Sequence, residues 1–301
     1  MIVVTGATGN VGRPLVRLLG QAGEQVTAVS RRITSADVPA ADSPAADAPA
    51  ADAPAADAPA RVRAVPADLA NAPTLRPALE GADAVFLAPA GDLLASAGSP
   101  GVLIEVIKQS GVQRVVLLSS QASHTRPQAI SHARLRDFEH AVTSSGLDWT
   151  VLRPGGFASN TFAYIPSIRT ARTVAAPFGD VGLPLIDPAD IAEVGAAALR
   201  DDHRAGHIYV LTGPSLVSPR QQAAALGAAL GFRLDFTELT RDQALATMVQ
   251  FMPEPVAQGT LDILGAPTQE EQSISPDVEK ILGRAPRTFA EWAQRNIAAF
   301  R

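Results

Sequence analysis

The chain contains no cysteine among its 301 residues, which excludes a disulfide framework, a thiolate nucleophile and a cysteine-ligated metal site. Lysine and arginine number 25 against 30 aspartate and glutamate, so the chain lacks the basic excess with which proteins bind nucleic-acid phosphates. No apolar run approaches the ~18 residues of a membrane span, and no charged segment precedes the apolar start. These absences predict a soluble cytoplasmic protein with neither nucleic acid nor membrane as partner.

The acidic excess lies in one segment. Residues 33–60 hold five aspartates and no basic residue, and they repeat Pro-Ala-Ala-Asp every five residues. Recurrent proline removes a backbone donor about once per helical turn, and alanine buries too little area to offset the entropy of ordering. We therefore predict a disordered insertion without a crossover helix. Its role is left open between an inert insertion and a spacer that binds a partner.

Short apolar runs alternate with helical patterns through the first two thirds of the chain. This alternation predicts an α/β fold, a Rossmann-type doubly wound parallel sheet. After residue 213 the pattern is mostly helical, with one strand near 233–238. We expect residues 1–155 with about 187–213 to form an NAD(P)-binding domain, and about 156–186 with 214–301 to form a smaller, mostly helical substrate lobe. The expected strands are 2–5, 25–30, 61–65, 84–88, 114–119, 149–152 and 208–212.

The first strand runs directly into a glycine-rich loop. Gly6, Gly9 and Gly12 are spaced so that they allow a tight turn, a close approach of backbone N–H groups to a pyrophosphate and close packing of the following helix on the strand. The positive end of that helix would face the phosphates. Strand, loop and helix together predict a dinucleotide site.

The second strand ends in Arg31 and Arg32, where an NAD site would normally place an acid for the ribose hydroxyls. A guanidinium suits a 2′-phosphate, so NADP(H) is expected in preference to NAD(H), with Arg31 ahead of Arg32. The alternative is a solvated basic strand end. Asp68, just after the third strand, either accepts a hydrogen bond from adenine or caps the next helix.

Six motifs stand out along the chain: Thr5 to Gly12, Asp68-Leu69, Ser119-Ser120, Ser145 to Phe157 with Asn160, Asp187 to Ala192, and Arg287 to Trp292. Together they resemble the NmrA-like branch of the atypical extended short-chain dehydrogenases/reductases. The resemblance implies one of two activities: NAD(P)H-dependent reduction of quinones, azo compounds or aromatic natural products, or sensing of the dinucleotide without turnover. It also implies cofactor contacts from Thr8, Asn10, Val11, Leu69, Ala88, Pro89, Ser119 and Pro154.

The sequence departs from this family at its acid pair. Short-chain reductases use serine with Tyr-x-x-x-Lys, whereas His132 and Arg136 stand here at the tyrosine and lysine positions, with Ser119 or Ser120 as the serine. Arginine does not shuttle protons, and its charge should lower the pKa of the neighbouring imidazolium. His132, Ser120 and Arg136 are the catalytic candidates. The alternative is that His132 is a plain helix residue at the cleft edge.

This pair is a poor acid for an ordinary ketone but sufficient for a quinone, whose reduction yields a phenolate that water can protonate. We expect an NADPH-dependent oxidoreductase acting on a small planar organic substrate, with a quinone-like or conjugated aromatic or polyketide carbonyl. Phe157, Asn160 and Tyr164 either line its pocket or pack between lobes. The alternatives are a non-catalytic NADP(H)-sensing regulator and an isomerase or cyclase with a structural cofactor.

His124, His132 and His140 are eight residues apart, too far for one metal, and no metal is expected. Asp187 and Asp190 should cap the helix at 190–200. Met248, Phe251 and Met252 either close the pocket or, as we favour, pack into the core of the lobe. A homodimer is kept open.

Overall fold

The computed structural model describes residues 1–38, 62–89, 91–95 and 98–301. The repeat at 39–60, predicted to be disordered and to lack a crossover helix, lies outside these residues. Residues 33–38, which we assigned to the same insertion, have a defined structure: Ile33 is buried and η1 (Ser35–Asp37) is a short 3-10 helix. The Thr34 N–H and hydroxyl both donate to the Asp37 carboxylate, at 2.9 and 2.8 Å. This local capping orders a segment whose composition showed no helical period.

The described chain divides into two compact units. The first unit comprises residues 1–118, 137–151 and 192–207, and the second comprises 119–136, 152–191 and 208–301. The units group residues by packing alone. The division into a cofactor-binding and a substrate-binding domain therefore stays a prediction.

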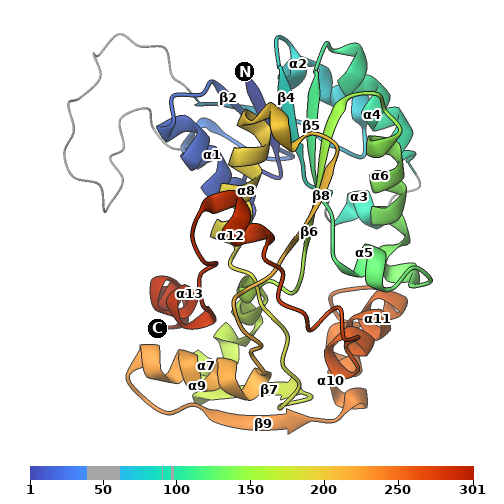
Figure 1. Cartoon of the computed structure of the whole chain (residues 1–301). Coiled ribbons are helices and arrows are strands. Elements are labelled where there is room, and N and C mark those ends of the chain that lie inside the picture. Colours follow the sequence, from blue (N-terminus) through green and yellow to red (C-terminus); the bar gives the residue numbers. More distant parts are fainter. Residues whose placement is uncertain (39–61, 90, 96–97) are drawn as a thin grey trace, which may run out of the picture. The chain divides into compact units, whose positions relative to one another are not determined.

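Seven strands form one sheet in the order β3-β2-β1-β4-β5-β6-β8 (Figure 1). The pairings of β1 with β2 and β4, of β2 with β3, and of β4 with β5 are parallel. This order and the helices between the strands confirm the predicted Rossmann-type α/β fold. The strands are β1 (Ile2–Thr5), β2 (Val26–Ser30), β3 (Val62–Pro66), β4 (Ala84–Leu87), β5 (Arg114–Leu118), β6 (Asp148–Pro154) and β8 (His207–Leu211).

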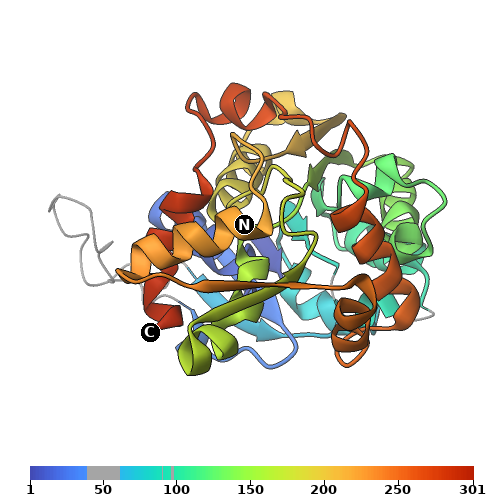
Figure 2. The ribbon, with the colours of Figure 1, turned by 90° about the horizontal axis from the view of Figure 1, so that it is seen from below.

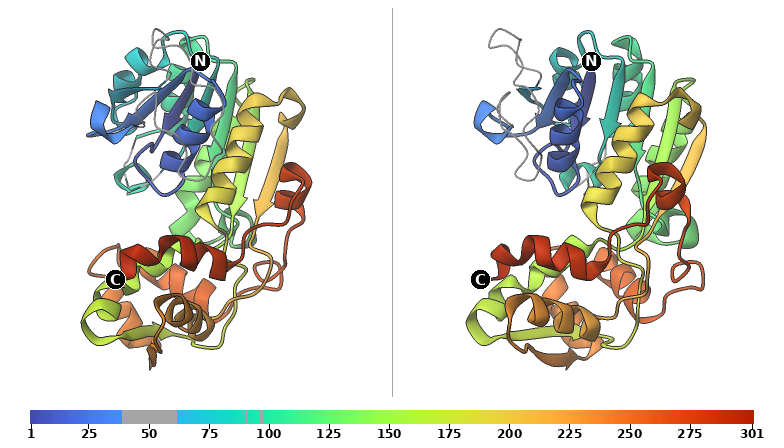
Figure 3. Two further views of the ribbon diagram at one scale, coloured as in Figure 1. Left: turned by 90° about the vertical axis from the view of Figure 1, so that its left-hand side faces the viewer. Right: turned by 60° about the vertical axis from the view of Figure 1, so that its left-hand side comes forward.

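Helices cover both faces of the strands in the first unit. On one face, Val85 and Val115 pack in a buried cluster with Ile107 of α4 and Phe138 of α6. On the other, Phe86 faces α8, where a Cβ on Gly195 would meet its ring at 3.0 Å. Figures 1 and 3 show α1 and α4 on opposite sides of these strands. The helices are α1 (Gly12–Gln21), α2 (Arg76–Leu79), α3 (Asp92–Ala95), α4 (Pro100–Gln109), α6 (Ala133–Thr143) and α8 (Pro188–Arg200).

The second unit has its own small sheet, in which β7 (Thr173–Pro177) pairs in parallel with β9 (Asp235–Leu239). Strand β7 was not predicted, because it lies inside a connection that shows no long apolar alternation. Figure 2 shows α9 beside this two-stranded sheet, and Ile168, Leu226 and Trp292 belong to the buried cluster of the unit. Its helices are α5 (Ala122–Thr125), α7 (Ile165–Ala171), α9 (Pro219–Leu230), α10 (Arg241–Met248), α11 (Glu254–Gly265), α12 (Asp277–Leu282) and α13 (Phe289–Asn296).

No helix within the described ranges is both long and apolar enough to cross a membrane.

Candidate functional site

The glycine loop is fixed to the end of a neighbouring strand. The Thr5 hydroxyl donates to the Phe86 carbonyl oxygen at 3.0 Å and accepts the Ala88 N–H at 2.9 Å. Gly6 follows with φ +65°, and its carbonyl oxygen accepts the Gly9 N–H at 2.9 Å. The residues after β1 and after β4 are thereby held side by side at the carboxyl edge of the sheet, where open α/β folds bind ligands.

Two of the glycines have no room for a side chain. A Cβ on Gly12 would lie 2.1 Å from the Gly6 carbonyl oxygen. A Cβ on Gly6 would meet the Ala88 Cβ at 3.3 Å, on a left-handed residue that disfavours any side chain. The first turn of α1 carries no acidic residue, and no side chain caps its N–H groups. A cradle of small residues with uncapped N–H groups fits the pyrophosphate of a dinucleotide.

Positive charge gathers after β2. Arg31 and Arg32 are exposed there, as expected from the sequence. The Thr34 N–H and hydroxyl lower the pKa of Asp37, and the charge of Arg13 lowers it further. The one carboxylate of the described turn 33–38 is thus engaged by Thr34, while Arg13 of α1 adds a cation that sequence reasoning missed. Its position directly after the last glycine, in the first turn of the helix, was the available signal.

Asp68 holds its own turn. Its carboxylate accepts the Ala70 N–H at 3.0 Å, and Thr74 bonds to both its N–H and its carbonyl. Asp68 therefore closes the bend after β3 and caps no helix directly. Leu69 packs at the edge of the buried cluster. The cofactor contacts of these two residues stay predictions.

The candidate acid pair lies in the second unit. His132 is the last residue of η3 (Ile130–His132), which runs directly into α6. His132 and Arg136 therefore lie about one helical turn apart. The Ser131 hydroxyl lies 3.0 Å from His132 Nδ1. Arg136 donates to the carbonyl oxygens of Arg126 and Ala129, at 3.2 and 2.9 Å. The arginine thus clasps the loop before His132, a structural task that the sequence did not predict.

Burial lowers the pKa of His132, and the charge of Arg136 lowers it further, with Glu271 opposing both. The expected effect of Arg136 is present, although burial is the larger cause. The imidazole is therefore neutral near pH 7. In that state it donates one hydrogen bond and carries no charge.

The two candidate serines differ in their surroundings. Ser119 is buried, and its hydroxyl lies 3.3 Å from that of Ser123. Ser120 is half-buried and accepts the Ala122 N–H at 3.3 Å, at the start of α5. Ser120 is thus the more accessible of the two, consistent with its place among the catalytic candidates.

The segment after β6 is held by backbone pairing. The Ala158 N–H donates to the Ile186 carbonyl at 2.9 Å, and the Ile186 N–H donates to that of Gly156 at 2.8 Å. Between these bonds, Phe157 is half-buried, and Asn160 follows with an exposed side chain. Pro154, the predicted cofactor contact, is buried at the end of β6.

The aromatic residues that follow belong mainly to packing. The Phe162 ring lies 5.2 Å from Trp292 and 5.8 Å from Phe300, between ring centroids. Tyr164 packs against the same cluster, and burial raises the pKa of its hydroxyl to about 12. Phe162 therefore packs within the second unit. The substrate contacts of Phe157, Asn160 and Tyr164 stay predictions.

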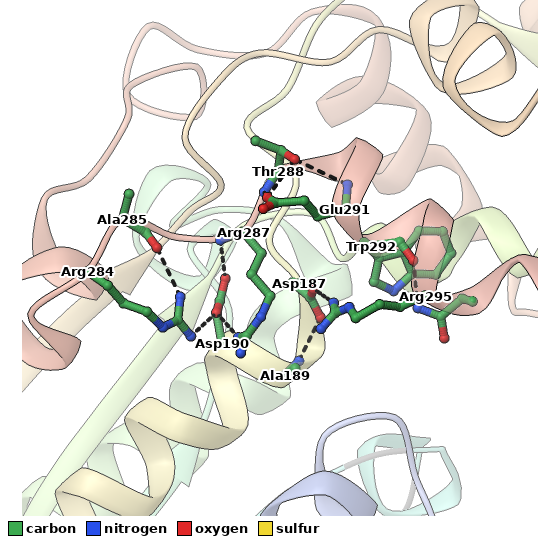
Figure 4. A network of polar contacts seen from close by, with 11 residues as sticks. Asp187, Ala189, Asp190, Arg284, Ala285, Arg287, Thr288, Glu291, Trp292 and Arg295 are labelled. Carbon is green, nitrogen blue, oxygen red and sulfur yellow. Dashed lines mark hydrogen bonds and ion pairs between the residues drawn. The ribbon is translucent and has the colours of Figure 1, made fainter. Parts of the chain in front are cut away.

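Two buried aspartates tie the start of α8 to the C-terminal segment (Figure 4). Asp187 caps the helix as expected, accepting the Ala189 N–H at 2.9 Å, and pairs with Arg295. Asp190 is not a cap: it is fully buried, accepts from Arg284 and from the Arg287 N–H, each at 2.7 Å, and also pairs with the Arg287 side chain. Burial raises the pKa of Asp187, with the Ala189 N–H and Arg295 opposing.

A further buried carboxylate, which the sequence did not predict, braces α5. Glu271 is 3% exposed and accepts from Arg126, at 2.8 and 2.7 Å, and from Thr125 at 2.7 Å. Burial would raise the pKa of Glu271, but Arg126 and the Thr268 N–H lower it, and the net shift is downward. This cluster and Arg136 both act on Arg126, and so fix the loop that leads to His132.

Phe251 corrects one packing expectation. Its side chain is 81% exposed, at the turn between α10 and α11. It does not pack into the core of the lobe, because α10 ends at Met248, three residues earlier. Among the described residues, no three histidine, aspartate or glutamate side chains cluster as a metal site would require.

The chain was compared with known proteins. A family model described as NAD(P)H-binding matches residues 6–202. The chain belongs to this family. Its glycine loop, both candidate serines and the His132–Arg136 pair all lie within the matched residues. The predicted membership of an NAD(P)H-binding family is thereby confirmed.

Three named proteins are similar to this chain over nearly its whole length. A (4-alkanoyl-5-oxo-2,5-dihydrofuran-3-yl)methyl phosphate reductase of Streptomyces griseus is 33% identical, covering 100% of this chain and 99% of its own. An NADPH-dependent quinone oxidoreductase of Escherichia coli, solved with NADPH, is 23% identical with a TM-score of 0.75, covering 98% and 99%. The regulator NmrA, solved with NADP, is 19% identical with a TM-score of 0.73, covering 99% and 95%.

The full-length relative at 33% identity is a named reductase, and the protein is accordingly an NAD(P)H-dependent reductase of this family. The two solved structures share its fold.

The lowered pKa of His132 should weaken the protein in acid. Burial, and then Arg136, lower this pKa in the folded state. In the unfolded chain His132 has the ordinary histidine pKa of about 6.5, so below that pH the unfolded state binds the proton more readily than the folded state does. The free energy of unfolding should fall as the pH drops below 7, and His132→Gln should remove part of that fall. Urea unfolding across this range checks it, with exposed His140→Gln as control. The expectation fails if wild type and His132→Gln respond equally to pH.

Proposed function

We propose that the protein reduces a small planar conjugated carbonyl compound, quinone-like or butenolide-like, with NADPH as hydride donor. The observation that carries this is the uncapped glycine cradle at α1 in a chain that is 33% identical, over its whole length, to a reductase named for an (alkanoyl-oxo-dihydrofuranyl)methyl phosphate. Both that ring and a quinone delocalise the charge left by hydride addition. Such acceptors need little acid catalysis.

The residues around His132 fit such an acceptor. Bound NADPH would supply the hydride. In the tautomer that carries its proton on Nε2, His132 accepts the Ser131 hydroxyl at Nδ1 and donates its Nε2–H to the carbonyl oxygen of the substrate. The neutral imidazole polarises the carbonyl without giving up a proton, and water protonates the phenolate or enolate afterwards. Arg136 acts on the loop carbonyls instead of lowering a tyrosine pKa, and this argues against alcohol-dehydrogenase chemistry.

Turnover of NADPH tests the proposal. NADPH oxidation with a benzoquinone, a naphthoquinone and an alkanoyl butenolide should exceed the blank for at least one acceptor, and His132→Gln should slow it about tenfold or more. His140→Gln is the matched control and should be unaffected. If no acceptor is reduced although NADPH binds, the sensing role takes the place of catalysis.

The cofactor proposed is NADPH in preference to NADH. Arg31, Arg32 and Arg13 supply the cations for a 2′-phosphate, while Thr34 engages the Asp37 carboxylate that would otherwise suit ribose hydroxyls. Localisation in the cytoplasm and a homodimer remain predictions from the sequence.

Arg31→Ala tests the cofactor preference. A charge-assisted hydrogen bond contributes about 1.5–3 kcal/mol, so the variant should bind NADPH about tenfold to a hundredfold more weakly and NADH almost unchanged. Calorimetric titration with both cofactors measures this, with Arg17→Ala on the exposed face of α1 as control. Equal losses for the two cofactors would show that Arg31 does not read the 2′-phosphate.

A further inference from the structure

A groove of about 660 Å³ lies on the second unit, apart from every residue discussed as a catalytic candidate. Its floor is apolar, with Ile168 and Phe300 each 1% exposed and Leu230 beside them. Its rim carries three arginines, and no acidic side chain lines it. The arginines are Arg169, Arg172 and Arg301.

Arg172 is held in a conformation that costs free energy. It follows α7 with φ +53°, in the left-handed region that helix ends normally fill with glycine. In that region the Cβ of a side chain lies too close to the following carbonyl oxygen. The Arg172 guanidinium lies over the Phe232 ring, 4.6 Å from its centroid. A strained residue with a fixed cationic head points to a task for the side chain itself.

A second arginine of the same unit shows what is unusual about this one. Arg220 also lies 4.6 Å from the centroid of a ring, that of Phe236, but it pairs with Asp180 and Glu238, each at 3.0 Å. Within the described residues, Arg172 has no such pair. Asp235 is the acid that approaches it, through a backbone N–H that donates to the Arg172 carbonyl at 3.0 Å, and its carboxylate forms no ion pair with Arg172.

Arg169 adds a second cation, one turn earlier on α7. Neither Arg169 nor Arg301 forms an ion pair within the described part of the chain. Arg169 and Arg172, which form no ion pair within the described residues, lie beside an apolar floor. Together they offer the two features that recognise an amphipathic anion: planar forks for its oxygens and a surface for its carbon skeleton. The groove volume is within the range of small-molecule sites.

We propose that this groove binds a small organic phosphate or carboxylate, with the anion on Arg169 and Arg172 and its apolar part on the floor beside Phe232 and Phe300. The site is separate from the hydride-transfer proposal and does not depend on it. The competing reading is that both arginines merely complement the negative end of α7. The two readings differ for Arg172→Gly: the binding site predicts a loss of affinity for the anion, whereas the helix-end role predicts none.

Phenyl phosphate is the probe, titrated calorimetrically in the presence of saturating NADP⁺ so that the glycine loop is filled. Wild type should bind it measurably, and more tightly than inorganic phosphate or phenol. Arg172→Gly should weaken binding about tenfold or more, since a charge-assisted bond is lost, while its thermal midpoint stays the same or rises because the left-handed strain is relieved. Arg169→Gln should weaken binding similarly.

Arg220→Gln is the matched control. It also removes an arginine that lies over an aromatic ring, but the charge of Arg220 is already neutralised by Asp180 and Glu238. The affinity of this variant for phenyl phosphate should equal that of wild type. The proposal is overturned if wild type does not bind the probe. It is equally overturned if Arg172→Gly and Arg169→Gln bind as wild type does, or if Arg220→Gln loses as much. If inorganic phosphate binds as tightly as phenyl phosphate, the apolar floor does not contribute to binding, and that part of the proposal is refuted.

Discussion

Gly12→Ala should abolish useful dinucleotide binding. The new Cβ would lie 2.1 Å from the Gly6 carbonyl oxygen, 2.7 Å from its carbonyl carbon and 2.8 Å from the Ala7 Cα. All three are backbone atoms, so no side-chain rotation relieves the contact. The loop must move away from α1, and the N–H groups that would face the pyrophosphate move with it.

The expected losses are large. Forced overpacking costs about 1–3 kcal/mol of stability, and a misplaced phosphate loop should weaken NADPH binding about a hundredfold or more. Calorimetric titration and thermal unfolding measure the two effects together. Gly101→Ala is the matched control: it also lies in the first turn of a helix, α4, but its Cβ would meet only the Ser99 hydroxyl, at 3.5 Å. NADPH binding by Gly12→Ala at near wild-type affinity would contradict this account of the loop.

Replacing both Arg284 and Arg287 by methionine should destabilise the fold by about 3–5 kcal/mol. Asp190 is fully buried, and these two side chains supply its cationic partners. Methionine keeps the apolar stems but removes both guanidinium groups, so that the carboxylate keeps the backbone N–H of residue 287, at 2.7 Å, as a donor. A buried charge without compensation is the costly case, whereas loss of a surface pair is not.

Denaturant unfolding measures this difference. The control is Arg241→Met, which breaks the pair of Arg241 with Asp262, whose side chains are 42% and 57% exposed; a loss below about 1 kcal/mol is expected. Adding Asp190→Asn to the double methionine variant should restore part of the stability, because the buried charge is then gone. A double variant no less stable than Arg241→Met would show that the network of Figure 4 does not hold the C-terminal segment.

The sequence predicted those elements whose signal is local. The glycine spacing between an apolar strand and an amphipathic helix fixed the start of the Rossmann-type sheet, and Arg31 and Arg32 came out exposed after β2. Strand β7 was missed, since its pairing with β9 joins residues about sixty positions apart and leaves no period in the sequence. The turn at 35–37 was also missed, because a single capping box orders it without periodicity.

The candidate site was predictable in composition but not in hydrogen bonding. The four-residue spacing of His132 and Arg136 could be seen in the sequence. The sequence could not show that Arg136 donates its hydrogen bonds to the carbonyls of Arg126 and Ala129. Asp190 was predicted to be a helix cap because a cap is recognised from neighbouring residues. Its actual partners are arginines about a hundred residues away in the sequence. Long-range ion pairs of this kind require the fold before they can be assigned.

Single-turnover oxidation of protein-bound NADPH tests the central claim most directly. The protein is loaded with one equivalent of NADPH without oxygen and mixed with a naphthoquinone in a stopped-flow instrument. The account predicts that bound NADPH disappears faster than free NADPH and that one quinol forms per NADPH. Deuterium at the transferred position of NADPH should slow the step. Bound NADPH that remains reduced with every conjugated acceptor would contradict the account and leave a protein that binds the dinucleotide without using it.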